Sequence, residues 1–150
     1  LDDKVGGKKT LKVTLLGLML AIALAVSAPE IRPFLQYVFG GSSVPNWVNA
    51  KNIFWIAAVL IGVFSGPNQS SSRSLMGRFT PEEKKNEFFG FFAFSGKATA
   101  FVGPFLLGAL TVAFDSQRAG ISIVFFFFLF GYFLLGRVDE EKGMEQGGFI

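Results

Sequence analysis

Apolar residues gather in four long blocks along the chain, at 11–28, 53–75, 88–114 and 119–136, with polar stretches between them. A helix needs about 20 residues to cross the roughly 30 Å hydrocarbon core of a bilayer. Backbone groups in lipid must find their hydrogen-bond partners within the segment, so blocks of this length predict helices. The pattern therefore predicts an all-α membrane protein with four transmembrane helices, followed by a solvated tail at 137–150.

The polar stretches carry signals for the helix ends. Thr80, Pro81 and Glu83 fit a capping box, which predicts that the third helix begins ahead of residue 88 with Thr80 as its N-cap. Pro67 removes a backbone donor inside the second block, so we expect a kink there. The turn at 115–118 is short, and it predicts an antiparallel hairpin of the third and fourth helices.

The stretch at 31–39, IRPFLQYVF, is too apolar for a free linker between the first two helices. One interpretation places it along the outer membrane interface, where Tyr and Trp are favoured. The other is an ordinary loop packed on helix ends.

The positive charges predict the orientation. Ten Lys and Arg residues belong to one set of connections and three to the other. Because Lys and Arg concentrate in cytoplasmic loops, both termini are expected in the cytoplasm. This asymmetry also accounts for the net charge of +3 without a nucleic-acid partner. The ten are Lys4, Lys8, Lys9, Lys12, Arg73, Arg78, Lys84, Lys85, Arg137 and Lys142, and the three are Arg32, Lys51 and Arg118.

Composition narrows the function. Charged residues make up 17% of the chain, against about a quarter in soluble domains. The sequence contains no Cys and no His, so the usual ligands of zinc or haem are missing and we predict no cofactor. An enzyme fits poorly without a nucleophile–His pair, and an ATP-driven pump fits poorly without a phosphate-binding loop. Because the chain opens on Leu1 rather than Met, we expect a fragment whose missing N-terminal helices are its partners, together with the lipid bilayer.

The third block carries Lys97 near its middle, on a face of otherwise small or helix-bending residues. An ionisable group at that depth costs roughly 2.5–3.5 kcal/mol on insertion scales. Three interpretations stay open: a binding or gating charge, a lysine that locks two helices through carbonyl groups, and a snorkelling side chain. An acidic partner would lie outside these 150 residues. The face comprises Gly90, Ala93, Lys97, Ala100, Pro104, Gly108 and Thr111, with Gly103 beside it.

The second block has a similar face, graded from aromatic through small to amide and guanidinium groups. Such a face suits a wet cavity, and a bend beside Asn68 and Gln69 would expose carbonyl groups there. The alternative is a packing seam, with Gly62 and Gly66 as a helix-packing pair and Arg73 at the cytoplasmic interface. The face comprises Trp55, Ala58, Gly62, Ser65, Gln69, Ser72, Arg73 and Met76. Predicted cavity residues are Ser65, Asn68, Gln69, Ser72 and Lys97, and predicted structural residues are Gly62, Gly66, Pro67, Arg73, Gly103 and Pro104.

The opening LDDKVGGKKTL resembles the loop signature of the major facilitator superfamily, with Asp3, Lys4, Gly6 and Lys8 on its D, r, G and k positions. Gly7 stands where arginine is usual. Further motifs follow in order and together resemble the vacuole effluxer-like branch of that superfamily, which is known from fungal autophagy and from bacteria. They lie at 66–74, 81–90, 95–99, 103–104, 116–120 and 137–143. Pro67 is a local departure from the bacterial pattern.

The resemblance implies spans nine to twelve of a twelve-helix transporter that works by alternating access, in a bacterial inner membrane. The second block would be the tenth helix, lining the cavity, and the third would be the eleventh, with Lys97 facing the other half. Asp3, Lys4, Gly6 and Lys8 would form a gating loop. The cargo would be a small solute, with amino acids and protons as candidates. The alternative is a non-transporting membrane scaffold.

Overall fold

The computed structural model describes residues 6–40 and 44–148, and this part of the chain is built from helices alone. Four helices are long and apolar enough to cross a membrane, which confirms the prediction of an all-α chain with four long apolar helices. The elements are α2 (Gly7–Phe39), α3 (Ala50–Phe79), the short 3-10 helix η1 (Glu82–Lys84), α4 (Lys85–Ala113), α5 (Gln117–Arg137) and α6 (Glu140–Gln146).

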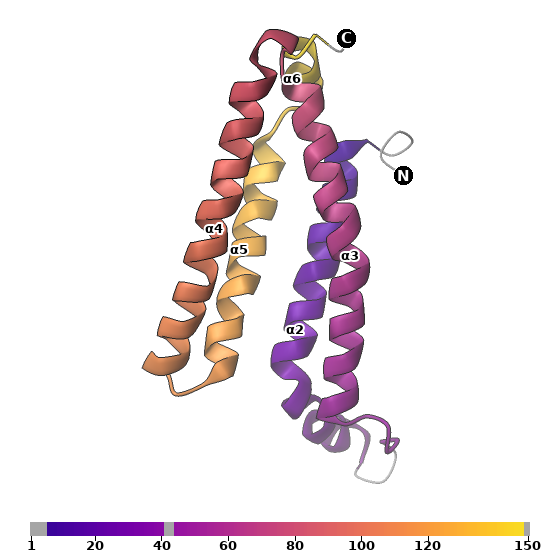
Figure 1. Ribbon diagram of the computed structural model, residues 1–150. Coiled ribbons are helices and arrows are strands. Elements are labelled where there is room, and N and C mark those ends of the chain that lie inside the picture. The colour runs from indigo at the N-terminus through magenta and orange to yellow at the C-terminus, as the bar shows by residue number, and fades with distance from the viewer. Residues whose placement is uncertain (1–5, 41–43, 149–150) are drawn as a thin grey trace.

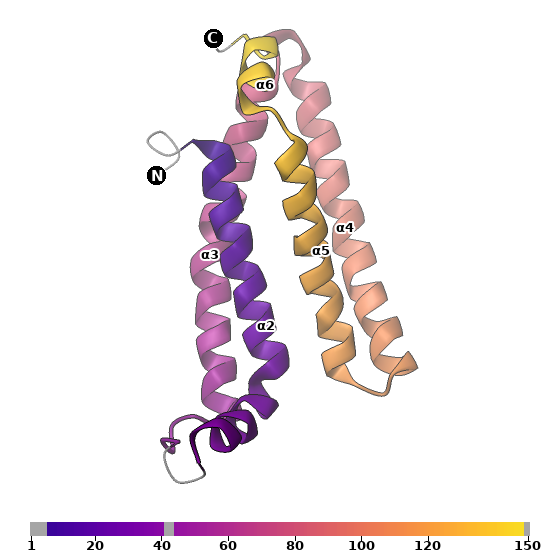
Figure 2. The same cartoon turned by 180° about the vertical axis from the view of Figure 1, so that it is seen from behind.

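The long helices form two antiparallel pairs, α2 with α3 and α4 with α5. The pairs are joined by contacts between α2 and α5, whereas α3 and α4 make few contacts with each other. Figures 1 and 2 show the pairs close together at the end that carries α6 and apart at the other end. A broad face of α3 and α4 is therefore left open between the pairs.

Helix α2 extends well past the predicted end of the first span at residue 28. It continues through Pro29 and Pro33 to Phe39. Figures 1 and 2 show its last turns bent away from the axis of the first part, as expected where proline interrupts the hydrogen-bond ladder. This segment packs on the end of α3, as one of our two interpretations held, but it is a helix and not a loop.

The tight contacts within each pair depend on glycines outside the predicted stripes. A Cβ added at Gly17 would lie 2.6 Å from the ring of Phe64, and one added at Gly120 would lie 2.7 Å from the Leu107 carbonyl oxygen. Cβ atoms added at Gly62, Gly66 and Gly103 would meet no atom within 4 Å in the described part of the chain. That these three glycines pack against other helices therefore stays a prediction, and those helices would not be among the ones that the structure describes.

One prediction about the connections is wrong. Thr80 is not the N-cap of the third helix: it ends α3, and its buried hydroxyl donates to the Met76 carbonyl at 2.6 Å. The chain passes through η1 before α4 begins at Lys85, which is still ahead of residue 88. Within the predicted tail at 137–150, the short helix α6 forms and contacts α3. The predicted hairpin between α4 and α5 is confirmed.

Candidate functional site

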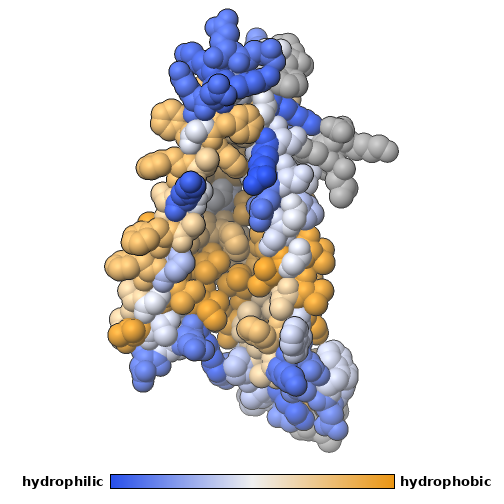
Figure 3. Space-filling model, in the orientation of Figure 1, coloured by the Kyte–Doolittle hydropathy of each residue, from blue (hydrophilic) through white to orange (hydrophobic). Residues whose placement is uncertain are grey.

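The open faces of α3 and α4 carry polar side chains, within helices that are long and apolar enough to cross a membrane. Gln69, Arg73 and Lys97 are exposed, and Ser65 and Ser72 are half-buried. Figure 3 shows hydrophilic side chains on both α3 and α4, on either side of a hollow between the helix pairs. Helix α4 has no buried residue in the described structure. These faces are therefore available to a cavity or to further helices.

Lys97 lies twelve residues after the start of α4 and sixteen before its end. At a rise of about 1.5 Å per residue, its Cα is roughly 18 Å from one end of the helix and 24 Å from the other. Among the residues that the structure describes, its ammonium group makes no hydrogen bond and no ion pair. The partner that we expected outside these residues stays a prediction.

Asn68 does not share the open face with Gln69. Its side-chain amide donates to the hydroxyl of Thr14 at 2.9 Å, and Thr14 is buried where α2 meets α3. Thr14 in turn donates to the Leu11 carbonyl at 3.0 Å. Side chains of successive residues in a helix point about 100° apart, so the neighbouring side chains of Asn68 and Gln69 can lie on different surfaces. The structure thus places Asn68 in the α2–α3 interface.

Replacing Asn68 with alanine is expected to lower the free energy of unfolding by about 1 kcal/mol, since the buried Thr14 hydroxyl loses its donor. Thermal unfolding of the purified protein in detergent measures this change. Gln69→Ala is the matched control on the next residue, and it should leave the unfolding temperature unchanged because Gln69 is exposed. Equal effects of the two substitutions would contradict the assignment.

The predicted gating loop is described only in part, because Asp3 and Lys4 lie outside the described residues. Gly6 is the N-cap of α2 with φ at 89°, a conformation that favours glycine. The Lys8 ammonium donates to the carbonyl groups of Gly136, at 3.4 Å, and Val138. Lys8 therefore binds the C-terminal end of α5, where a cation is favoured by the helix dipole.

Glu140, which follows the C-terminal end of α5, binds the N-terminal end of α2. Its carboxylate accepts hydrogen bonds from the backbone N–H groups of Gly7, at 2.9 Å, and Lys8, at 3.3 Å. A carboxylate at a helix N-terminus satisfies free N–H groups and complements the dipole. We call this pair of contacts, made by Lys8 and Glu140, the end clasp. The sequence pattern predicts only a solvated tail here, and it does not predict the contact of Glu140 with α2.

Helix α6 also rests on the end of α3. A Cβ added at Gly143 would lie 2.7 Å from the ring of Phe79, and one added at Gly147 would lie 2.2 Å from the Arg78 carbonyl oxygen. The end clasp and these glycine contacts together join α2, α3, α5 and α6 at one end of the molecule (Figure 1).

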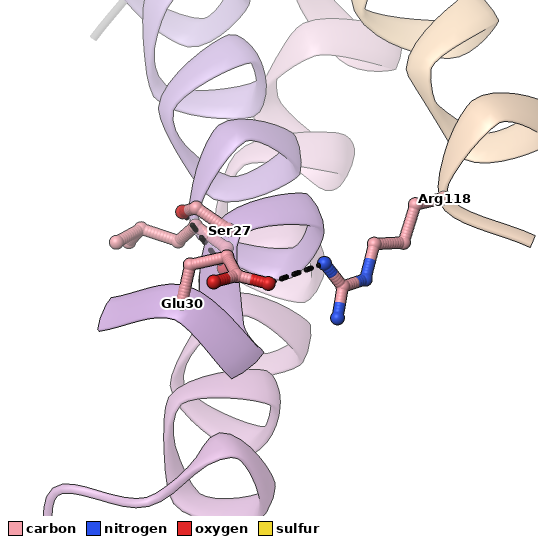
Figure 4. A network of polar contacts seen from close by, with 4 residues as sticks. Ser27, Glu30 and Arg118 are labelled. Carbon is pink, nitrogen blue, oxygen red and sulfur yellow. Dashed lines mark hydrogen bonds and ion pairs between the residues drawn. The ribbon is translucent and has the colours of Figure 1, made fainter. Parts of the chain in front are cut away.

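An ion pair joins α2 and α5 at the other end. The Arg118 guanidinium lies 2.9 Å from the Glu30 carboxylate, and Figure 4 shows this contact beside Ser27. Both side chains are substantially exposed, so the pair contributes little stability, about 0–1 kcal/mol. Helices α2 and α5 are nevertheless held together by polar contacts at both ends.

Comparison with known proteins identifies relatives of the chain. A family model described as "Vacuole effluxer Atg22 like" matches residues 34–148. The chain is 32% identical over 92 residues to the uncharacterized MFS-type transporter YxiO of Bacillus subtilis, covering 61% of this chain and 22% of that protein. It is 27% identical over 136 residues to autophagy-related protein 22 of Candida glabrata, covering 83% and 25%.

A third relative is autophagy-related protein 22-2 of Aspergillus niger, 31% identical over 90 residues, which cover 60% of this chain and 15% of that protein. The chain thus spans a quarter or less of the length of these relatives. No solved structure matches it.

Proposed function

Because the chain belongs to the family of vacuole effluxer Atg22-like proteins, we propose that it is part of a secondary transporter that moves a small solute by alternating access. The family is one of MFS-type transporters and not of enzymes. The chain is accordingly an integral membrane protein with four candidate spans. Its substrate, coupling ion and partners are part of the proposal.

The observation that carries the proposal is the open polar surface of α3 and α4. Lys97 and Gln69 are exposed there at membrane depth, and Lys97 has no partner in the described structure. A charge in hydrocarbon is costly, so such groups face water, another helix or a ligand. An aqueous cavity between two halves of a transporter provides all three.

The proposed place of the chain is spans nine to twelve of a twelve-helix fold, with α3 as the tenth helix and α4 as the eleventh. Further helices of the same protein would then cover the open stripes with Gly62, Gly66, Gly103 and Pro104. The end clasp would lie in the cytoplasm, where Lys and Arg gather. Asp3, Lys4, Gly6 and Lys8 would gate that end in a bacterial inner membrane.

The cargo that we propose is an amino acid or a similar small anion-bearing solute, with protons as a candidate coupling ion. The ammonium group of Lys97 on α4 would attract a carboxylate by charge, and the amide of Gln69 on α3 could donate a hydrogen bond to a solute in the cavity between the two helices. Asn68 would support this site indirectly, because its bond to Thr14 holds α3 against α2.

The function is tested by reconstituting the full-length protein in vesicles and measuring counterflow of a panel of amino acids, with and without an imposed pH gradient. We expect saturable flux of at least one amino acid, absent from protein-free vesicles. A folded, monodisperse protein without flux for any member of the panel would contradict the proposed cargo. Insensitivity to the pH gradient would contradict proton coupling.

A further inference from the structure

The bent end of α2 forms a feature that transport does not account for. We call residues 29–39 the elbow. Figures 1 and 2 show the elbow turned across the end of the α2–α3 pair that is remote from α6. A segment turned in this way crosses the direction of the long helices instead of extending it.

The elbow has two apolar faces with different surroundings. Its inner face places Ile31 and Leu35 against a buried cluster of Ala28, Val48 and Ile53. Its outer face carries Phe34 and Tyr37, which are 64% and 89% exposed and are three residues apart on one side of the helix. Phe39 at the end of the elbow and Trp47 in the following loop are also exposed. Exposed aromatic side chains are thus present on the outer face of the elbow, at its end and in the loop that follows.

Polar contacts lie at and next to the elbow. The ion pair between Glu30 and Arg118 lies at its beginning (Figure 4), and Arg32 donates to the side chain of Asn46 at 3.5 Å. Figure 3 shows hydrophilic residues collected at this end, with the apolar surface of the spans directly above them. The elbow thus lies where the surface changes from apolar to polar, and this is the level at which Tyr and Trp are enriched in membrane proteins.

We propose that the elbow is an interfacial anchor, with Phe34, Tyr37 and Trp47 inserted among lipid headgroups and upper acyl chains of the leaflet opposite α6. Amphipathic helices in this position bury an apolar face at the headgroup boundary. The inner face packs on α3, so the anchor holds the α2–α3 end at a constant depth. This binding of lipid does not depend on the proposed transport function.

Spin labels measure the depth directly. The sequence given has no Cys, so a single Cys can be introduced at Tyr37 in a full-length background freed of any other Cys. In vesicles, the collision rates of the label with lipid-soluble oxygen and with water-soluble nickel complex report depth. Lys142→Cys on α6 is the aqueous reference, because Lys142 is 78% exposed outside the spans. Phe126→Cys near the middle of α5 is the hydrocarbon reference.

The expected oxygen-to-nickel ratio at Tyr37 lies between those of the two references. A ratio equal to that of Lys142 would place the elbow in water and overturn the proposal. A ratio equal to that of Phe126 would place it in the hydrocarbon core and also overturn it. Low collision rates with both reagents would mean that protein covers the face, and this result would likewise overturn the proposal. Phe34→Cys on the same face repeats the measurement if Tyr37→Cys does not fold.

Discussion

Replacing Lys97 with methionine is expected to lower solute flux through the full-length transporter at least about tenfold. The side chain of methionine is similar in length but cannot hold a charge, so any carboxylate that Lys97 binds, on the cargo or on another helix, loses its counter-ion. A tenfold loss corresponds to about 1.4 kcal/mol, which is less than the cost of placing the charge at that depth. Counterflow in vesicles measures the effect.

The matched control is Lys85→Met on the same helix. Lys85 lies at the first residue of α4 and pairs with Glu82 at the surface, so its loss should leave flux unchanged. Thermal unfolding separates the interpretations of Lys97: a binding charge leaves the unfolding temperature unchanged or raises it, whereas a lock between helices lowers it. Equal flux in wild type and Lys97→Met would exclude a mechanistic role and favour packing or snorkelling.

Replacing Gly120 with alanine is expected to lower the free energy of unfolding by about 2 kcal/mol or more. The new Cβ would lie 2.1 Å from the Thr111 hydroxyl oxygen and 2.7 Å from the Leu107 carbonyl oxygen. The hydroxyl of Thr111 already donates to that same carbonyl group. A backbone atom cannot be moved by a rotamer change, so α4 and α5 must separate, and overpacking of this kind typically costs about 1–3 kcal/mol. Thermal or denaturant unfolding in detergent measures the loss.

Gly131→Ala is the matched control on the same helix, because a Cβ there would meet no atom within 4 Å in the described structure. It should leave stability unchanged or raise it by up to about 1 kcal/mol through helix propensity. Adding Thr111→Ala to Gly120→Ala should restore only part of the loss, since the Leu107 carbonyl remains. An unchanged unfolding temperature in Gly120→Ala would mean that α4 and α5 do not approach this closely.

Much of the candidate site could be predicted from the pattern of polar residues within apolar blocks. Lys97 stands out in the sequence as a charge among small residues of an apolar block, and Gln69 as an amide on a face that grows more polar along the helix. Both are exposed on open faces in the structure. Asn68 stands out equally, yet it packs on Thr14 in the neighbouring helix. Periodicity assigns a residue to an angle on its own helix, but it does not say which neighbouring helix lies at that angle.

The ends of the helices were less predictable. The sequence around Thr80 fits a capping box for the third helix. In the structure Thr80 instead follows the last residue of α3, and its hydroxyl donates to the Met76 carbonyl. In the sequence, Glu140 is one of several acidic residues in a polar tail. Its carboxylate accepts a hydrogen bond from the backbone of Gly7 at the start of α2, which is 133 residues away along the chain. Long-range contacts of this kind leave no local signal in the chain.

The sequence by itself determined the all-α class and the number of long apolar helices. The thickness of a bilayer sets the length of a span, and backbone groups in lipid must be hydrogen-bonded within the helix, so the length of each apolar block predicts a helix. Tertiary structure alone decided which glycines bring helices together, where Asn68 points, and that Lys8 and Glu140 bind the facing ends of α5 and α2. Those outcomes depend on which helices become neighbours and at what distance, and that is a property of the packed chain as a whole.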